Sequence, residues 1–357
     1  MGWALAIDKA DISDATLIET RSAPLEDGQA RLAVRRFAMT ANNITYAAFG
    51  AIMRYWEFFP GGDAGHLPVW GFAEVTETRA DGLETGERIY GYFPAADELI
   101  VEPARIGAGS FIDASPHRAD LPAAYNRYTR CKGDPGYTPE REAVQMVLQP
   151  LFLTSWLIDL HLREEAVFGA RRVSLTSASS KTALALAWLL HRNRPEGVSV
   201  EAMTSNRSQV FVAHTGFYDT VTLYGDLDAL QADPKRLIVD FAGDHQITTG
   251  IHNALGDALA ADIRVGAAHW EHAAPPKGLP GPKPVFFFAP DHVARRICEW
   301  GPGEFAKRYA ADWTAFAEEG ARLFEEEELS GGEGALEAYT RLITNTASPE
   351  AAMTVRV

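Results

Sequence analysis

Short apolar runs alternate with helical stretches through the second half of this chain. The most informative segment is 171–191 (RRVSLTSASSKTALALAWLLH), in which a β-rich run and a turn of small hydroxyl residues precede an apolar helix. Further buried strands are predicted at 198–203, 220–224, 236–241 and 263–267, with helices at 211–216 and 246–261. This alternation is typical of a parallel α/β sheet and predicts a doubly wound Rossmann domain.

The first half of the chain has a different pattern. Residues 1–135 contain β-branched and aromatic runs broken by Gly and Pro, as expected of a small β-barrel. A helix is predicted at 140–163 with an interruption at Pro150, and another at 306–328, whose acidic end (325–328) is expected to be solvated. A short apolar strand is predicted at 285–288.

The turn after the strand that begins at 171 has the order of a nucleotide site but lacks its glycines. A dinucleotide fingerprint needs glycines for a tight turn and a close approach to pyrophosphate, and this chain has Ser177, Ser180 and Ala183 there. A P-loop fails because Leu175 and Ser180 occupy both of its glycine positions. The alternative is a serine cap on a buried helix. The candidate phosphate contacts are Ser177, Ser179, Ser180, Lys181 and Thr182.

The next strand indicates which cofactor the turn would take. It ends in Ser205, Asn206 and Arg207, and no carboxylate lies between positions 202 and 210. An acidic residue there would bind a free ribose hydroxyl, whereas an arginine beside hydroxyls suits a 2′-phosphate. The pattern predicts NADPH rather than NADH, unless Arg207 is simply a solvated cation. Further candidate cofactor contacts at strand ends are Ala242, Gly243 and Gly266.

The amino-acid composition limits the classes of protein to which this chain can belong. The 357 residues are 46% hydrophobic, which suits two domains, and carry a formal charge of −15. That charge argues against nucleic-acid or anionic-membrane partners, which need a basic surface. We expect no signal peptide and no spanning helix, because no apolar stretch approaches the required ~20 residues. Two cysteines in a chain of this length indicate a reducing compartment, so we expect a cytoplasmic protein.

A zinc site is not expected. Cys131 and Cys298 are too few for the thiolate sets of zinc dehydrogenases. His66 stands near the position of a catalytic ligand, but no cysteine precedes it, and the His and Glu residues of 269–272 (HWEH) are followed by two prolines that favour a loop. We predict no metal.

Three segments carry a family resemblance: 42–46 (NNITY), 69–75 (VWGFAEV) and 83–91 (LETGERIYG). With the strand order, they make the chain resemble the zinc-free quinone and enoyl reductases among the medium-chain dehydrogenase/reductases, and more narrowly the DUF2855 family. The resemblance implies a GroES-like catalytic domain from 1–135 and 330–357, to which 352–357 returns as a strand. It implies a Rossmann domain from 136–329.

The resemblance also implies a function. It implies an NADPH-dependent reduction of an activated double bond or carbonyl on a small apolar substrate, and a homodimer formed through 285–288. The implied proton donor is Tyr55, with Tyr46 second, beside Asn43, and Tyr224 falls at a cofactor turn. Trp56, Phe58 and Phe59 would form an apolar wall or barrel core. Because all three loop glycines are replaced, the alternative is a catalytically silent binding protein on the same scaffold.

Overall fold

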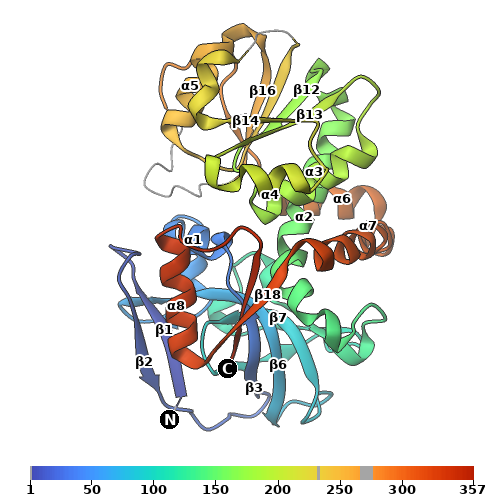
Figure 1. The fold of residues 1–357 in the computed structure, drawn as a ribbon. Coiled ribbons are helices and arrows are strands. Elements are labelled where there is room, and N and C mark those ends of the chain that lie inside the picture. The colour runs from blue at the N-terminus through green and yellow to red at the C-terminus, as the bar shows by residue number, and fades with distance from the viewer. Residues whose placement is uncertain (1, 231–233, 266–275) are drawn as a thin grey trace. The chain divides into compact units, whose positions relative to one another are not determined.

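The chain forms two compact units in the computed structural model, which describes residues 2–230, 234–265 and 276–357 (Figure 1). Unit 1 comprises Met1–Val147 and Phe324–Val357, and unit 2 comprises Leu148–Leu323. The helices are α1 (Ala41–Ala48), α2 (Glu142–Glu164), α3 (Lys181–Asn193), α4 (Gln209–His214), α5 (His245–Leu255), α6 (Ala289–Trp300), α7 (Pro302–Leu323) and α8 (Gly331–Ile343).

Unit 1 is built on largely antiparallel sheets, with strand orders β2-β1-β5-β4 and β18-β19-β3-β6-β7-β11-β10-β9. Its strands are β1 (Gly2–Asp8), β2 (Ala15–Thr20), β3 (Ala30–Ala38), β4 (Pro60–Gly61), β5 (Ala64–His66), β6 (Pro68–Thr78), β7 (Arg88–Pro94), β8 (Glu98–Val101), β9 (Pro103–Ala104), β10 (Ser110–Asp113), β11 (Arg127–Arg130), β18 (Glu325–Ser330) and β19 (Ala351–Arg356). The C-terminal strand β19 pairs with β3, which confirms its predicted return to the first part of the fold. The hairpin from β6 to β7 turns at Gly86, whose φ of 88° favours glycine.

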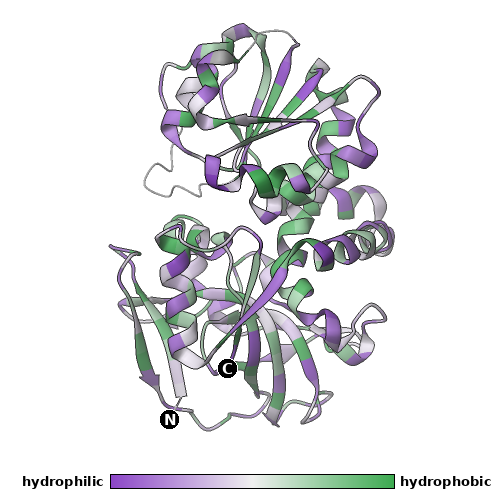
Figure 2. Ribbon diagram, viewed as in Figure 1, coloured by the Kyte–Doolittle hydropathy of each residue, from purple (hydrophilic) through white to green (hydrophobic). Residues whose placement is uncertain are grey.

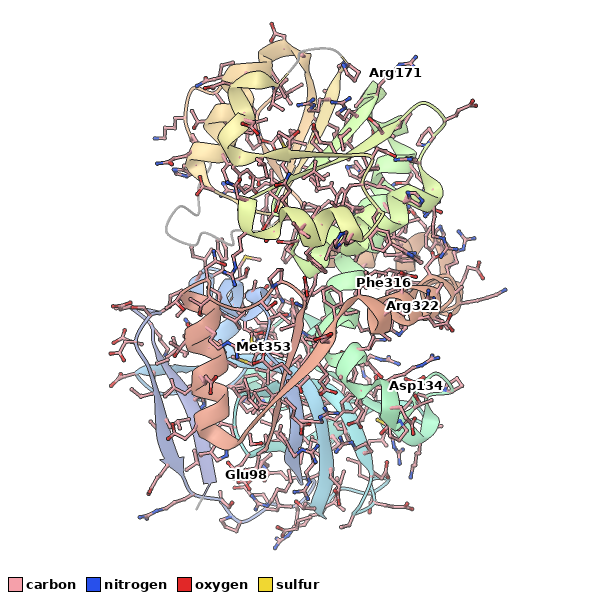
Figure 3. All side chains as sticks on the ribbon, in the orientation of Figure 1. Glu98, Asp134, Arg171, Phe316, Arg322 and Met353 are labelled. Atoms are coloured by element: carbon pink, nitrogen blue, oxygen red, sulfur yellow. The ribbon has the colours of Figure 1, made fainter. Side chains whose placement is uncertain are left out.

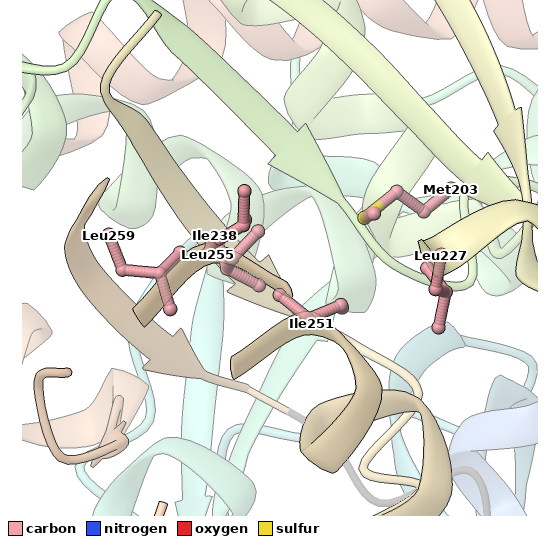
Figure 4. Packing of buried hydrophobic residues seen from close by; sticks show 6 residues of the cluster. All are labelled: Met203, Leu227, Ile238, Ile251, Leu255 and Leu259. Carbon is pink, nitrogen blue, oxygen red and sulfur yellow. The ribbon is translucent and has the colours of Figure 1, made fainter. Parts of the chain in front are cut away.

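Unit 2 contains the predicted Rossmann-type sheet. Its strands are β12 (Arg172–Leu175), β13 (Ser199–Thr204), β14 (Thr220–Leu223), β15 (Arg236–Asp240), β16 (Leu259–Arg264) and β17 (Val285–Phe286). They pair in parallel in the order β14-β13-β12-β15-β16-β17. Figure 4 shows the apolar cluster of Met203, Leu227, Ile238, Ile251, Leu255 and Leu259, which packs strand, loop and helix residues together. The fold class predicted from the sequence is confirmed.

Aromatic side chains hold the helices of unit 2 together. Phe152 on α2 stacks on Phe316 of α7 with ring centroids 4.9 Å apart, and the ring centroid of Trp188 on α3 lies 5.3 Å from that of Phe316. Phe316 is labelled in Figure 3. Hydrophobic colouring concentrates on α2 and α3 in Figure 2. Contrary to the sequence prediction, the stretch Pro139–Glu164 is long and apolar enough to cross a membrane, but 61% of its apolar window is buried in the protein. This burial identifies it as a core helix.

Helix α2 differs from its predicted form. The helix continues through Pro150, although a proline inside a helix removes a backbone bond and costs about 3 kcal/mol. Val147, Leu148 and Phe152 on either side are buried, and each buried side chain of this kind contributes about 1.5–3 kcal/mol. Packing therefore outweighs the local penalty, and the predicted interruption is wrong.

The predicted helix end at 325–328 is also wrong. Helix α7 ends at Leu323, and Glu325–Ser330 forms the edge strand β18, parallel to β19. Its carboxylates are held by basic side chains of neighbouring elements: Glu327 pairs with Arg341, and Glu328 pairs with Arg356 at 2.7 Å. Strand pairing and these contacts override the helical preference of the glutamates.

A second boundary lies earlier than predicted. Helix α5 ends at Leu255, because Gly256 takes a φ of 47° that ends the helix, and β16 starts at Leu259 rather than Ile263. The predicted strand at 285–288 is confirmed only as the two residues of β17.

A buried histidine ties the end of α5 to the loop before β17. His252 contacts the Asp262 carboxylate through Nε2 at 2.9 Å and the Pro280 carbonyl through Nδ1 at 2.7 Å. Both partners are acceptors, so the pair of contacts is complete only when both ring nitrogens carry protons. Burial opposes this charge, but the hydrogen bonds to Asp262 and Pro280 raise the pKa of His252 overall.

We predict that His252→Gln destabilises the protein more at pH 5.5 than at pH 8.5. Because the folded pKa is raised, the stabilisation is present below the ordinary histidine pKa and is lost as pH rises through the folded value. The expected loss at pH 5.5 is about 1–3 kcal/mol, the range for buried groups left without a partner. Urea unfolding at both pH values measures it, with His191→Gln on the exposed end of α3 as the control. Equal losses at the two pH values would contradict the assignment.

Candidate functional site

The parallel sheet of unit 2 reverses its strand order between β12 and β15. The chain runs outward from β12 to β14, then returns to place β15 on the other side of β12. Ligands of open α/β sheets bind at the carboxyl ends of the strands at such a switch point. The turns that follow β12 and β15 are therefore the candidate site, as the sequence predicted.

A buried carboxylate joins these two turns. The Thr176 hydroxyl donates to Oδ1 of Asp240 at 2.6 Å, and the Ala242 and Gly243 amides donate to the same oxygen at 3.1 Å. The Thr176 hydroxyl oxygen in turn accepts from the Ala242 amide at 3.0 Å. Burial raises the pKa of Asp240, while these donors oppose the shift. The network fixes the spacing of the two turns.

The glycine-free turn takes a backbone form that usually requires glycine. Ser177 has a φ of 48°, in the left-handed region, which costs a non-glycine residue roughly 1–2 kcal/mol. Ser180 is the N-cap of α3, and its hydroxyl accepts from the Ala183 amide at 3.3 Å. The serine-cap interpretation is thus confirmed for Ser180, and the turn keeps a left-handed residue without glycine.

Two phenols from the β14 region hold this turn in place. The Ser177 amide donates to the Tyr224 hydroxyl at 2.6 Å, and the Tyr218 hydroxyl donates to the Ala178 carbonyl at 2.8 Å. Burial raises the pKa of both phenols, which keeps them protonated. The sequence analysis missed Tyr218, because a tyrosine beside a predicted strand has no pattern that distinguishes it from a packing residue.

The start of α3 offers donors and a positive charge. Lys181 and Thr182 occupy its first two positions, where backbone amides have no partner within the helix and the helix dipole favours an anion. Burial lowers the pKa of Lys181 to about 8. The Ser155 hydroxyl of α2 donates to the Thr182 carbonyl at 2.7 Å, which fastens this first turn.

The remaining predicted contacts lie at neighbouring strand ends. Ser205, Asn206 and Arg207 directly follow β13 and are exposed, and Gly243 follows β15 with a φ of 62°. Gly266 lies outside the described residues. The left-handed turn, the first amides of α3, Lys181 and the exposed arginine fit a phosphorylated dinucleotide, although Tyr224 already engages the Ser177 amide.

Unit 1 holds the predicted catalytic residues, and Asn43 has a structural role there. Its Oδ1 accepts from the Thr40 amide at 2.7 Å in the capping box of α1, and its Nδ2 donates to the Pro68 carbonyl at 2.8 Å. The side chain is buried, so both of its ends are engaged. Asn43 therefore fixes α1 against β6.

Tyr46, Tyr55, Tyr92 and Tyr125 gather with Trp70 in what we call the tyrosine cluster. Ring centroids lie 4.8 Å apart for Tyr46 and Tyr55 and 4.7 Å apart for Tyr92 and Tyr125. The Trp70 indole donates to the Tyr46 hydroxyl at 3.1 Å. Burial raises the pKa of all four phenols, so they stay protonated at neutral pH.

The aromatic residues after Tyr55 belong to the core. Trp56, Phe58 and Phe59 are buried, with exposed fractions of 7%, 0% and 4%. Phe58 packs against the tyrosine cluster, with its ring centroid 5.3 Å from that of Tyr125. The sequence offered no signal for Trp70, Tyr92 or Tyr125 as one group, because β6, β7 and the segment before β11 are far apart along the chain.

In the described ranges, no group of three or more His, Cys, Asp or Glu side chains is arranged to hold a metal ion. The histidines of 269–272 fall outside those ranges. The His66 imidazole is partly buried, and burial lowers its pKa.

The chain shares its fold with solved medium-chain dehydrogenase/reductases. It matches CurA from Vibrio vulnificus in complex with NADPH at a TM-score of 0.62 and 13% identity, over 100% of this chain and 99% of that chain. It matches the mycobacterial protein Rv1454c complexed with NADPH at 0.61 and 12%, over 100% of both chains. The Etr1p/NADP/crotonyl-CoA complex gives 0.57 and 12%, over 100% of this chain and 99% of that chain. At these identities the likeness concerns the fold.

Sequence comparison identifies the family. None of the curated proteins has a sequence that matches this chain. The model of the family described as "Protein of unknown function (DUF2855)" matches residues 37–348, which is most of the chain. The chain belongs to the DUF2855 family and has the medium-chain dehydrogenase/reductase fold.

Proposed function

We propose that this protein is a cytoplasmic, NADPH-dependent reductase that acts on an activated C=C or C=O bond of a small apolar substrate. The observation that carries the proposal is the turn after β12, which keeps a left-handed residue and a capped helix start at the sheet's switch point. The NADPH and NADP in the names of the similar structures support the same cofactor.

Different residues of unit 2 would bind different parts of the cofactor. Lys181 and the first amides of α3 would hold the pyrophosphate, and Arg207 with Ser205 would hold the 2′-phosphate. The bound nicotinamide would supply a hydride. These roles need no metal, because the substrate's negative charge can be met by a phenolic proton.

Unit 1 supplies that proton in the proposal. The tyrosine cluster presents phenols that stay protonated at neutral pH, and the surrounding side chains are aromatic. A site of this composition favours an uncharged, apolar reacting group. The crotonyl-CoA in the name of one similar structure is consistent with a conjugated double bond.

A catalytically silent binding protein is the second candidate. It is favoured by the Tyr224 hydroxyl, which engages the amide of Ser177 that a glycine loop would offer to pyrophosphate. A fluorescence titration of purified protein with NADPH and NADH separates the two functions. Saturable NADPH binding, followed by its oxidation with a conjugated carbonyl compound, supports the reductase, whereas no binding of either nucleotide overturns it.

The positive charge of Arg207 at the end of β13 should favour NADPH over NADH. We predict that Arg207→Ala weakens NADPH binding by about 1.5–3 kcal/mol, the range for hydrogen bonds to charged groups, and leaves NADH nearly unchanged. Calorimetric titration with each nucleotide measures the difference. Arg171→Ala, at the opposite end of β12, is the control and should change neither affinity. Equal losses of affinity for both nucleotides in Arg207→Ala would contradict the assignment of Arg207 to the 2′-phosphate.

Lys181 should make cofactor binding depend on pH. Its pKa of about 8 means that its charge is present at pH 7 and largely lost at pH 9. We predict that NADPH and NADH both bind more weakly at pH 9 than at pH 7, by a similar factor, because they share the pyrophosphate. Lys181→Arg, which stays charged over this range, should flatten the dependence. An unchanged pH profile in that variant would show that Lys181 does not contact the phosphates.

The outer strand of the parallel sheet motivates a homodimer. On β17, Val285 and Phe286 are 66% and 54% exposed, and β17 ends the strand order of the described sheet. A short apolar edge of this kind is an aggregation hazard unless another chain covers it. The proposal is that a second copy of this chain pairs there.

We predict a dimer by light scattering at micromolar concentration and a monomer for Phe286→Lys, because a charge on the edge opposes pairing. Val210→Lys on α4, where the side chain is 65% exposed, is the control and should stay dimeric. A monomeric parent protein would refute the dimer.

A further inference from the structure

We propose that the Tyr224 hydroxyl is an internal occupant of the cofactor turn, and that a nucleotide phosphate must displace it from the Ser177 amide in order to bind. This contact would lower the affinity for the cofactor and so regulate the site. The inference rests on the proposed function, and all of its residues lie in unit 2.

The Ser177 amide differs from its neighbours in the kind of acceptor to which it donates. Three other amides of the turn donate to backbone carbonyls: Thr176 to Val239, Ala178 to Met203 and Ser180 to Ser177. The Ser177 amide donates instead to a side chain, the Tyr224 hydroxyl, at 2.6 Å. A side-chain acceptor can be withdrawn by a change of rotamer, whereas a carbonyl moves only with its backbone. Among these four donors, the Ser177 amide is therefore the one that the protein can release.

Tyr224 lies where such a movement disturbs little of the fold. It directly follows β14, which is the outer strand of the described parallel sheet and pairs with β13 on one side. Its side chain is half-buried and packs against the apolar cluster that includes Leu227. Segments at an edge with few buried side chains open at a lower free-energy cost than the core. The hydroxyl can thus leave the turn while the sheet stays in place.

A phosphate oxygen is a stronger acceptor than the phenol that it would replace. Burial raises the pKa of Tyr224 above its ordinary value, so its hydroxyl is neutral. A hydrogen bond to a charged acceptor is roughly twice as strong as one between neutral groups. A phosphate would also gain the positive end of the α3 dipole and the charge of Lys181, neither of which a neutral phenol uses. The phenol therefore occupies the amide in the free protein and yields it to a phosphate.

The second phenol at this turn provides a matched control. The Tyr218 hydroxyl donates to the Ala178 carbonyl, which is an acceptor and so of no use to a phosphate. Loss of the Tyr218 hydroxyl would free no donor, whereas loss of the Tyr224 hydroxyl would free the Ser177 amide. The turn is still closed in both cases, because the Ser180 amide donates to the Ser177 carbonyl at 2.8 Å.

The first test observes the Ser177 amide without any nucleotide. Protein labelled with ¹⁵N-serine gives serine amide resonances, and the one missing in Ser177→Ala belongs to Ser177. We expect this amide to exchange with solvent deuterium faster in Tyr224→Phe than in the parent protein, and at the parent rate in Tyr218→Phe. Phenylalanine keeps the ring and its packing, so the change isolates the hydroxyl. An equal exchange rate in the parent and in Tyr224→Phe overturns the proposal.

The second test measures affinity by calorimetric titration with NADPH and NADH. Tyr224→Phe should bind both nucleotides about 2- to 12-fold more tightly than the parent protein, the factor that corresponds to one neutral hydrogen bond. The factor should be the same for both nucleotides, because they share the pyrophosphate. Tyr218→Phe should bind neither nucleotide more tightly than the parent does.

The outcomes distinguish this inference from the proposed function. If the parent binds NADPH and Tyr224→Phe binds it no more tightly, the hydroxyl does not compete with the phosphate, and only this inference is overturned. If the parent binds neither nucleotide but Tyr224→Phe binds both, the hydroxyl blocks the site completely, which supports the inference and removes the reductase function from the parent protein. If neither protein binds a nucleotide, the reductase and its internal occupant are both overturned.

Discussion

The buried contact between Thr176 and Asp240 is the constraint on which the candidate cofactor site depends. It joins the turn after β12 to the turn after β15 across the point where the strand order reverses. Without the Asp240 carboxylate, the Gly243 amide would lose its acceptor in a buried setting, and the Thr176 hydroxyl would lose its partner on the other turn. The sheet supplies two adjacent strand ends, and this carboxylate makes them one site.

The turn without glycine shows how side chains can replace backbone freedom. A left-handed serine costs free energy that a glycine would not, and that strain persists only where the surroundings fix the conformation. Tyr224 and Tyr218 do so by bonding the amide of Ser177 and the carbonyl of Ala178. The turn is thus shaped before any ligand arrives, which reduces the entropy that binding must overcome.

The sequence predicted most of the fold because its local signals agreed with the packing. The segment 171–191 became β12, the turn and α3, and the predicted C-terminal strand formed as β19. The errors arose where contacts with residues far away in the sequence determine the local structure. The glutamates of β18 form a strand because β19 and arginines from other elements lie beside them, and Pro150 stays helical because buried neighbours hold it. The candidate site was partly predictable for the same reason, since strand ends are local but the contacts among Tyr46, Trp70 and Tyr125 join separate elements.

Buried tyrosine hydroxyls make hydrogen bonds in the interior of both units. A phenol brings an apolar ring and one hydroxyl, and burial raises its pKa, so it stays neutral where a carboxylate or an amine would demand a partner. In unit 2 such hydroxyls hold a strained turn in place, and in unit 1 the Tyr46 hydroxyl accepts a hydrogen bond from the Trp70 indole. In the resting protein these hydroxyls therefore make their hydrogen bonds without burying a charge.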